Sequence, residues 1–204
     1  MASCTALVGL PEGGLSGCTS LQTLSMGSCS ALTRLPTDLV LGAALQSINL
    51  SQCISLRTLP DLRGCSELTE ISLHDCQALT AVGAGLRGLT KLKTLWIQHC
   101  GRLERLEGLD GCVSLEQLNL TKCEALVALP DGLRDCRELK TLNASGCSSL
   151  VSLGQGLGGC VNLTQLNLDD CSSLPAALPA GMASCATLLL LRLKNCVALR
   201  ALSH

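Results

Sequence analysis

The stretch LEQLNLTKCEALVALPDGLRDCRELKTLNASGC, residues 115–147, contains one phrase twice: L-x-x-L-x-L-x-x-C begins at Leu115 and again at Leu139. In the L-x-L part, leucines alternate with polar residues, which is the period-2 pattern of a short β-strand with one buried face. A cysteine returns at the same place after each strand. A unit that recurs at a fixed spacing is typical of a repeat architecture, so this stretch predicts a repeat protein.

The phrase extends over almost the whole chain of 204 residues. Its first leucine recurs every 23 to 25 residues, at Leu21, Leu45, Leu68, Leu92, Leu115, Leu139, Leu163 and Leu188. Residues 1–20 read as the second half of one more repeat. No repeat can bury its own leucines, so neighbouring coils must stack.

A return segment such as LPDGLRDCREL connects one phrase to the next. Many of these segments carry a Leu-Pro pair, with proline at Pro11, Pro36, Pro60, Pro130 and Pro179. Proline suits the first turn of a short helical or 3₁₀ segment, where no N–H donor is needed. We therefore predict a single α/β domain over residues 1–204. It is a horseshoe-shaped solenoid with about eight short parallel strands on its concave face and helical turns on its convex side.

The fifteen cysteines fall into two columns of this alignment. The first column ends the phrase: Cys4, Cys29, Cys53, Cys76, Cys100, Cys123, Cys147, Cys171 and Cys196. The second lies three residues before the next repeat: Cys18, Cys65, Cys112, Cys136, Cys160 and Cys185. Gly42 and Leu89 replace cysteine in the second column, which indicates a small buried packing position. A first-column thiol can hydrogen-bond weakly to main chain where the strand turns away, so we expect free, structural cysteines.

Composition and charge exclude several classes of partner. The formal net charge is -1, whereas nucleic-acid and acidic-membrane binding need a concentrated basic face. No apolar stretch approaches the ~20 residues of a membrane span. The start, MASCTALVGLPEGG, lacks the basic and apolar regions of a signal peptide. We expect a cytoplasmic protein that binds neither nucleic acid nor membrane.

The full pattern is L-x-x-L-x-L-x-x-C-x-x-L-x-x-L-P-x-x-L-x-x-C-x-x-L, and residues 145–174, SGCSSLVSLGQGLGGCVNLTQLNLDDCSSL, follow it closely. It resembles the leucine-rich repeats of plant intracellular immune receptors, especially those with a TIR domain and a nucleotide-binding domain. The resemblance implies a non-catalytic, protein-binding scaffold, such as the sensing region of an immune-receptor-like protein. The alternative is a substrate-recognition module of an F-box-type ubiquitin ligase, whose cysteine-type repeats are usually longer and lack the Leu-Pro pair.

Candidate binding residues follow from strand parity, because residues flanking the inward leucines point to the concave face. Trp96 is the only aromatic residue of the chain, and it lies between Leu95 and Ile97 in mid-array. An exposed tryptophan ringed by polar groups is typical of a binding hot spot; the alternative is a lone ring lying on its neighbours. The candidate protein-binding site comprises Trp96, Glu70, His74, Asp75, Gln98, His99, Asn119 and Lys122.

Chemistry other than binding finds little support. Asp75 and His99 share a column in adjacent repeats, with His74 nearby, but no tight ligand spacing indicates zinc, and a solvated polar pair is the simpler interpretation. Buried column cysteines lack the lowered pKa of a reactive thiolate. We therefore expect no metal, no cofactor and no enzymatic activity.

The C-terminal end is a second candidate contact surface. Solenoid ends normally carry a cap with a polar outer face, and neither end of this sequence reads as one. Leu189 and Leu190 occupy positions that are mostly polar in the other repeats. This predicts docking of a partner on this end, unless the last repeat is simply degenerate.

Overall fold

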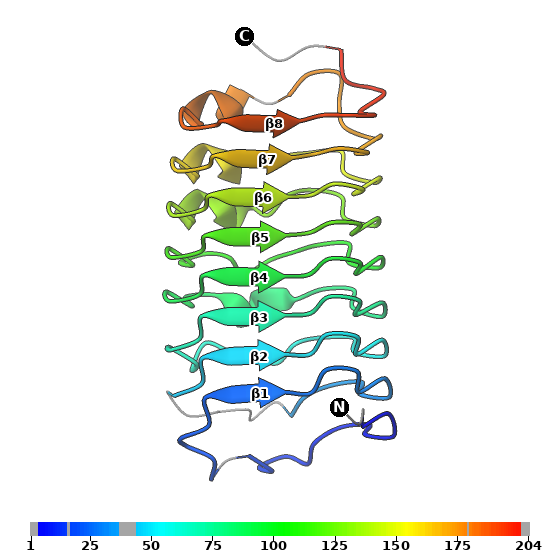
Figure 1. Cartoon of the computed structure of the whole chain (residues 1–204), viewed down its shortest axis with the longest axis vertical. Coiled ribbons are helices and arrows are strands. Elements are labelled where there is room, and N and C mark those ends of the chain that lie inside the picture. Colours follow the sequence, from blue (N-terminus) through cyan, green and yellow to red (C-terminus); the bar gives the residue numbers. More distant parts are fainter. Residues whose placement is uncertain (1–3, 16, 37–43, 179, 201–204) are drawn as a thin grey trace.

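The computed structural model describes residues 4–15, 17–36, 44–178 and 180–200 (Figure 1). Eight strands of three residues stack in chain order into one parallel sheet. They are β1 (Thr23–Ser25), β2 (Ser47–Asn49), β3 (Glu70–Ser72), β4 (Thr94–Trp96), β5 (Gln117–Asn119), β6 (Thr141–Asn143), β7 (Gln165–Asn167) and β8 (Leu190–Arg192). The predicted leucine-rich-repeat solenoid, with one strand per phrase, is confirmed.

Every junction between neighbouring strands repeats the same main-chain hydrogen bonds. Between β4 and β5, the N–H groups of Glu116 and Gln117 both donate to the Lys93 carbonyl. Ile97 N–H donates to the Asn119 carbonyl at 2.9 Å, and the N–H two residues further on donates to the Thr121 carbonyl at 2.7 Å. Equivalent bonds join each successive pair from β1 to β8. The strands are therefore locked in register, and each inward residue lies above its counterpart.

The core is built from these inward positions. The central residue of each strand from β2 to β7 is a leucine or isoleucine with at most 1 % of its surface exposed. Leucines and cysteines of the turn and return segments make up most of the rest of the same core cluster. Because aliphatic side chains stack on other aliphatic side chains of the next coil, the core needs no aromatic ring.

Short 3₁₀ helices lie on the return side: η1 (Gly83–Leu86), η2 (Asp131–Asp135), η3 (Gly156–Gly159) and η4 (Ala180–Ser184). The sequence prediction tied these turns to the Leu-Pro pair, which is only partly correct. Pro130 does precede η2, but η1 and η3 follow Val82 and Gln155. Pro60 has no helix after it, and Pro179 lies outside the described residues.

Coil length accounts for the helices better than proline does. Coils of 24 or 25 residues beginning at residues 68, 115, 139 and 163 contain a helix, whereas the 23-residue coils beginning at 45 and 92 contain none. The longer coils place three residues between two return-side leucines, as from Leu129 to Leu133, where the shorter ones place two, as from Leu106 to Leu109. Since these leucines must stay stacked, the extra residue is taken up in a 3₁₀ turn.

First-column cysteines close the turn after each strand from β2 to β8, as predicted. The Cys123 thiol donates to the Ile97 carbonyl of the preceding coil, with Sγ and O 3.2 Å apart. Six other column members make the equivalent bond at 3.1–3.2 Å: Cys53, Cys76, Cys100, Cys147, Cys171 and Cys196. All fifteen cysteines are free, and thirteen are buried. Cys4 and Cys18 are exposed, which corrects the expectation of burial at the N-terminal end.

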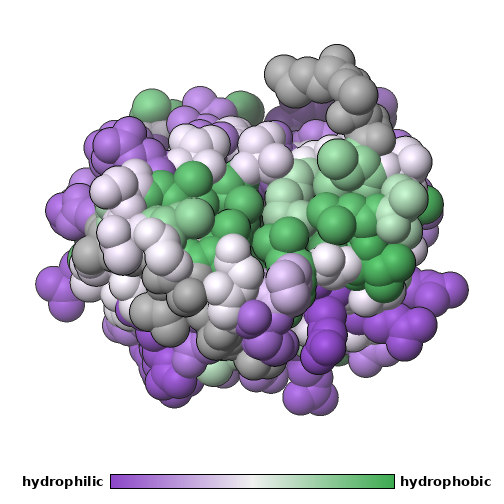
Figure 2. All heavy atoms as spheres, turned by 90° about the horizontal axis from the view of Figure 1, so that it is seen from below, coloured by the Kyte–Doolittle hydropathy of each residue, from purple (hydrophilic) through white to green (hydrophobic). Residues whose placement is uncertain are grey.

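The two ends of the stack leave apolar surface uncovered. Seen from the N-terminal end, apolar residues occupy the middle of the molecule and hydrophilic residues surround them (Figure 2). Leu7, Leu10 and Leu15 pack against the core there but are only partly buried. At the other end, Leu189 has 86 % of its surface exposed.

Candidate functional site

Trp96 lies on the concave face, which we define as the outward side of the β1–β8 sheet. It is the last residue of β4, in register between Ser72 and Asn119. Leu95 and Ile97 are fully buried, so the indole projects outward, where it is partly exposed. Since both flanking side chains are small and polar, the ring is the largest apolar group in the middle of this face.

Asparagines at the strand ends hold the turns that follow them. The side-chain oxygen of Asn119 accepts the N–H of Thr121 at 3.0 Å and its hydroxyl at 2.7 Å. Asn49, Asn143 and Asn167 accept the N–H two residues ahead at the same distance. Sequence reasoning treated Asn119 only as a binding candidate, and the structure adds that its side-chain carbonyl already caps the strand end.

The residue before each first-column cysteine from Cys29 to Cys196 has a left-handed backbone, a feature that sequence reasoning missed. The non-glycine members have φ between 57° and 63°: Ser28, Gln52, Asp75, His99, Lys122, Asp170 and Asn195. Gly146 completes the column with φ 75°. This conformation is unusual outside glycine, asparagine and aspartate, and those residue types in the column were the available signal. Asp75, His99 and Lys122 therefore lie on the turns that border the sheet.

Asp75 joins two histidines, as the shared column suggested. His74 Nδ1 lies 3.2 Å from one carboxylate oxygen of Asp75, and His99 Nδ1 lies 3.3 Å from the other. All three side chains are about one-third to one-half exposed. Within the described part of the chain, no group of three or more His, Cys, Asp or Glu residues could hold a metal ion. The cluster is a solvated hydrogen-bonding edge beside the sheet.

The remaining candidates lie around Trp96 at different positions along the strands and the turns that follow them. Glu70 is exposed at the start of β3, in register with Thr94. Gln98 is partly buried, and its Oε1 is the one buried side-chain oxygen or nitrogen among the described residues that has no hydrogen-bond partner. Lys122 and His99 line a shallow hollow of about 300 Å³ outside the turns. The structure thus places Trp96, Glu70, His74, Gln98 and Asn119 on one face, and Asp75, His99 and Lys122 on the turns along its border.

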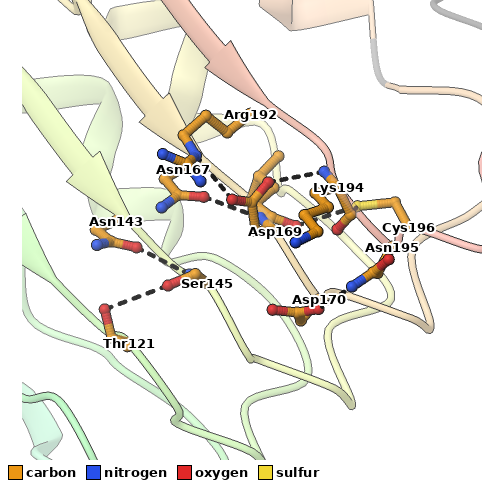
Figure 3. Close-up of polar contacts among 11 residues, drawn as sticks. Thr121, Asn143, Ser145, Asn167, Asp169, Asp170, Arg192, Lys194, Asn195 and Cys196 are labelled. Atoms are coloured by element: carbon orange, nitrogen blue, oxygen red, sulfur yellow. Dashed lines mark hydrogen bonds and ion pairs between the residues drawn. The ribbon is translucent and has the colours of Figure 1, made fainter.

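A polar network at the C-terminal part of the face was not foreseen (Figure 3). The Asp169 carboxylate accepts Arg192 Nε and Lys194 N–H, each at 2.7 Å. Burial alone would raise the pKa of Asp169, but these hydrogen bonds and the nearby positive charges outweigh it, so the pKa is lowered. Asp170 and Asn195 pair beside it at 2.7 Å. The signal was the position of Asp169 one coil before two cationic residues, Lys194 in the same column and Arg192 in the adjacent outward column.

The buried cysteine thiols offer little reactivity. Burial raises the pKa of Cys112 to about 11 and that of Cys147 to about 12. Burial likewise raises the pKa of Cys171 to about 12. A thiol that stays protonated at neutral pH is a poor nucleophile. In the described residues, no helix is long and apolar enough to cross a membrane.

Comparison with known proteins identifies the fold. No family profile matches the sequence, and no curated protein matches it. Among solved structures, the chain resembles the leucine-rich repeat domain of the type III effector XopL, with a TM-score of 0.70 and 21% identity over 91% of this chain and 73% of that one. A leucine-rich-repeat protein of Leptospira interrogans aligns with a TM-score of 0.47 and 22% identity, over 86% of this chain and 52% of that one. Such identities concern the fold alone.

Proposed function

We propose that the chain is a non-catalytic recognition scaffold that binds a protein partner on its concave face, with Trp96 at the centre of the contact. The single observation that carries this proposal is a lone tryptophan held outward between Ser72 and Asn119 on a hydrogen-bonded parallel sheet. A large ring in the middle of a polar face gains the most free energy when a partner covers it.

The surroundings of the ring support recognition by hydrogen bonds rather than by charge. The flanking outward positions on β3 to β6 are mostly uncharged: Ser72, Thr94, Gln117, Asn119, Thr141 and Asn143. Glu116 beside them is paired with Lys140 at 2.7 Å. The unpartnered Gln98 Oε1 offers an acceptor two residues from Trp96, because a partner's N–H or O–H can satisfy it after a small side-chain rotation.

The finer proposal is that this scaffold is the sensing region of an intracellular immune-receptor-like protein. The Leu-Pro pair in the return segments favours this class over the F-box-associated repeats, which usually lack it. Fifteen free cysteines support a reducing compartment such as the cytoplasm, since such compartments keep thiols unpaired.

Paired affinity capture tests the concave-face proposal. Wild type, Trp96→Ala and Val161→Ala are immobilised, and the dissociation constant of each captured partner is then measured. Val161 is a matched control because it is an exposed apolar residue outside the sheet. Trp96→Ala should weaken binding by about 2 kcal/mol or more, roughly thirtyfold, whereas Val161→Ala should not. Equal binding to all three proteins would refute the role of Trp96.

A further inference from the structure

The outer edge of β8 presents main-chain groups in the same arrangement that every other strand uses to pair. At each junction, one carbonyl accepts two N–H groups from the next coil, and two N–H groups donate to carbonyls of the next coil. In the last coil the corresponding groups are the Leu189 carbonyl and the N–H groups of Leu193 and Asn195. None of these three has a partner within the described residues.

The apolar core is open above the same strand. Leu188, Leu191 and Leu193 are only partly buried, although their counterparts one coil earlier are fully buried. Each of these leucines occupies an inward position of the phrase. A strand added beside β8 could therefore form main-chain hydrogen bonds with its edge, and its inward side chains could pack on the exposed core leucines.

The two surface positions at the start of this strand are apolar as well. Leu189 and Leu190 are 86 % and 46 % exposed, whereas the preceding coil has Thr164 and Gln165 there, and all other repeats also have polar residues. Neither the register nor the core requires leucine at these positions, since seven repeats stack without it. Apolar residues here gain free energy only when something covers them.

We propose that β8 binds an extended segment of another polypeptide as a ninth parallel strand. Two N–H groups of that segment donate to the Leu189 carbonyl, and two of its carbonyls accept from Leu193 and Asn195. Its alternate residues are apolar and cover Leu191 and Leu193, and the two residues that donate to the Leu189 carbonyl lie beside Leu189 and Leu190 and cover them. This mode of recognition takes affinity from main-chain hydrogen bonds and specificity from alternate side chains.

A second copy of the chain fits this edge poorly. Its β1 carries complementary free groups, but residues 4–15 and 17–20 already lie beneath β1 (Figure 1). There the Val8 carbonyl accepts Thr33 N–H, as the Ala176 carbonyl accepts Arg200 N–H at the other end. In a head-to-tail stack, the segment ending at Arg200 would have to occupy the place of the segment ending at Val8. An extended segment without such a turn avoids this clash.

The probe for the test is a synthetic peptide with the sequence of residues 162–170, NLTQLNLDD, which contains strand β7. Its two aspartates would lie beside Lys194, which makes no ion pair with any described residue. The proteins compared are wild type, the double variant Leu189→Thr/Leu190→Gln and the control Val8→Thr. The double variant carries the residues of the preceding repeat and should fold, and Val8 is a comparably exposed apolar residue at the opposite end.

Wild type should bind the peptide with a Kd below about 1 mM, and the double variant should bind at least about tenfold more weakly. Val8→Thr and Trp96→Ala should bind the peptide as wild type does. Because Trp96 is not part of the β8 edge, a failure of the β8 proposal can be told apart from a failure of the concave-face proposal. Peptide binding should slow hydrogen exchange at Leu193 and Asn195. A peptide N-methylated at the residues equivalent to Thr164 and Gln165 should not bind.

Three results would overturn the proposal. The first is no binding to wild type at millimolar peptide. The second is binding that the double variant leaves unchanged, which would place the site elsewhere. The third is self-association of wild type in light scattering that Leu189→Thr/Leu190→Gln abolishes, which would identify a second copy as the occupant.

Discussion

Some single residues point outward on the concave face and also make hydrogen bonds that stabilise the fold. Asn119 faces outward by parity, yet its carbonyl accepts two hydrogen bonds from Thr121. Asp169 is outward as well, yet only 6 % of its surface is exposed, because Arg192 and Lys194 enclose its carboxylate. A substitution on this face therefore has to be judged for folding before it is interpreted as a loss of binding.

Adjacent substitutions in β5 test this distinction. Leu118→Ala should destabilise the protein by about 2–5 kcal/mol because Leu118 is fully enclosed by neighbouring coils. Asn119→Ala should cost about 1 kcal/mol because the Thr121 N–H loses its acceptor. Parity alone would assign Asn119→Ala the small cost of a surface substitution. Urea denaturation of both variants measures the two losses, and equal losses would show that the strand register is wrong.

Acid should weaken the Asp169 network. Its folded-state pKa is lowered, so the network stabilises the protein above the unfolded-state pKa of about 4 and loses that contribution as pH falls through the lower folded-state value. Asp169→Asn removes the charge but keeps the shape. The variant should be less stable than wild type at pH 7, and the difference should shrink toward pH 2. A difference in unfolding free energy that is constant over this range would contradict the ion-pair role.

Residue-scale features differ in how far the sequence predicts them. The outward position of Trp96 follows from Leu95 and Ile97, because the side-chain period of a strand leaves no other choice. The left-handed turn at Lys122 does not follow from lysine itself, which has no preference for that conformation. Only the glycine, asparagine and aspartate residues elsewhere in the same column indicate it. The contact between Asp169 and Arg192 depends on how closely two coils approach, which a single sequence does not state.

Return segments are the elements that vary most from coil to coil. The spacing of two or three residues between their leucines decides whether a 3₁₀ helix forms. Proline was the more visible signal, and it misled the prediction because Pro60 and Pro130 occur in coils of different length. The strands were predictable because all eight share one sequence pattern. The return segments differ in length from coil to coil, and so their conformations differ as well.

Glycines on the return side permit this close stacking. A Cβ at Gly132 would lie 2.7 Å from Asp110 N and 2.8 Å from Leu109 C, both main-chain atoms of the preceding coil. Gly132→Ala should therefore cost about 1–3 kcal/mol, as in overpacked cores. Gly64→Ala is the matched control, since nothing lies within 4 Å of its Cβ position, and it should change stability by less than about 0.5 kcal/mol. Thermal unfolding of both variants checks the contrast, and a silent Gly132→Ala would mean that the coils are not this tightly stacked.

The whole molecule behaves as a one-dimensional stack in which each coil is stabilised by its two neighbours. Inner coils such as the one containing β5 have both neighbours, and their inward residues are fully buried. The end coils have one neighbour each, which leaves Leu7 and Leu191 partly exposed. Stability should therefore decrease toward the ends, where both the exposed thiols and the free β8 edge are found.

Thiol reactivity measures this arrangement across the entire stack. In native buffer, Ellman's reagent should react rapidly with two thiols, Cys4 and Cys18, because these are exposed. The other thirteen are buried, and burial raises the pKa of most of them, for example that of Cys53 to about 12, so they should react only as fast as the coils open. In denaturant all fifteen should react. Additional fast thiols in native buffer would show that inner coils open readily, and a shortfall in denaturant would reveal disulfides that contradict the free-thiol columns.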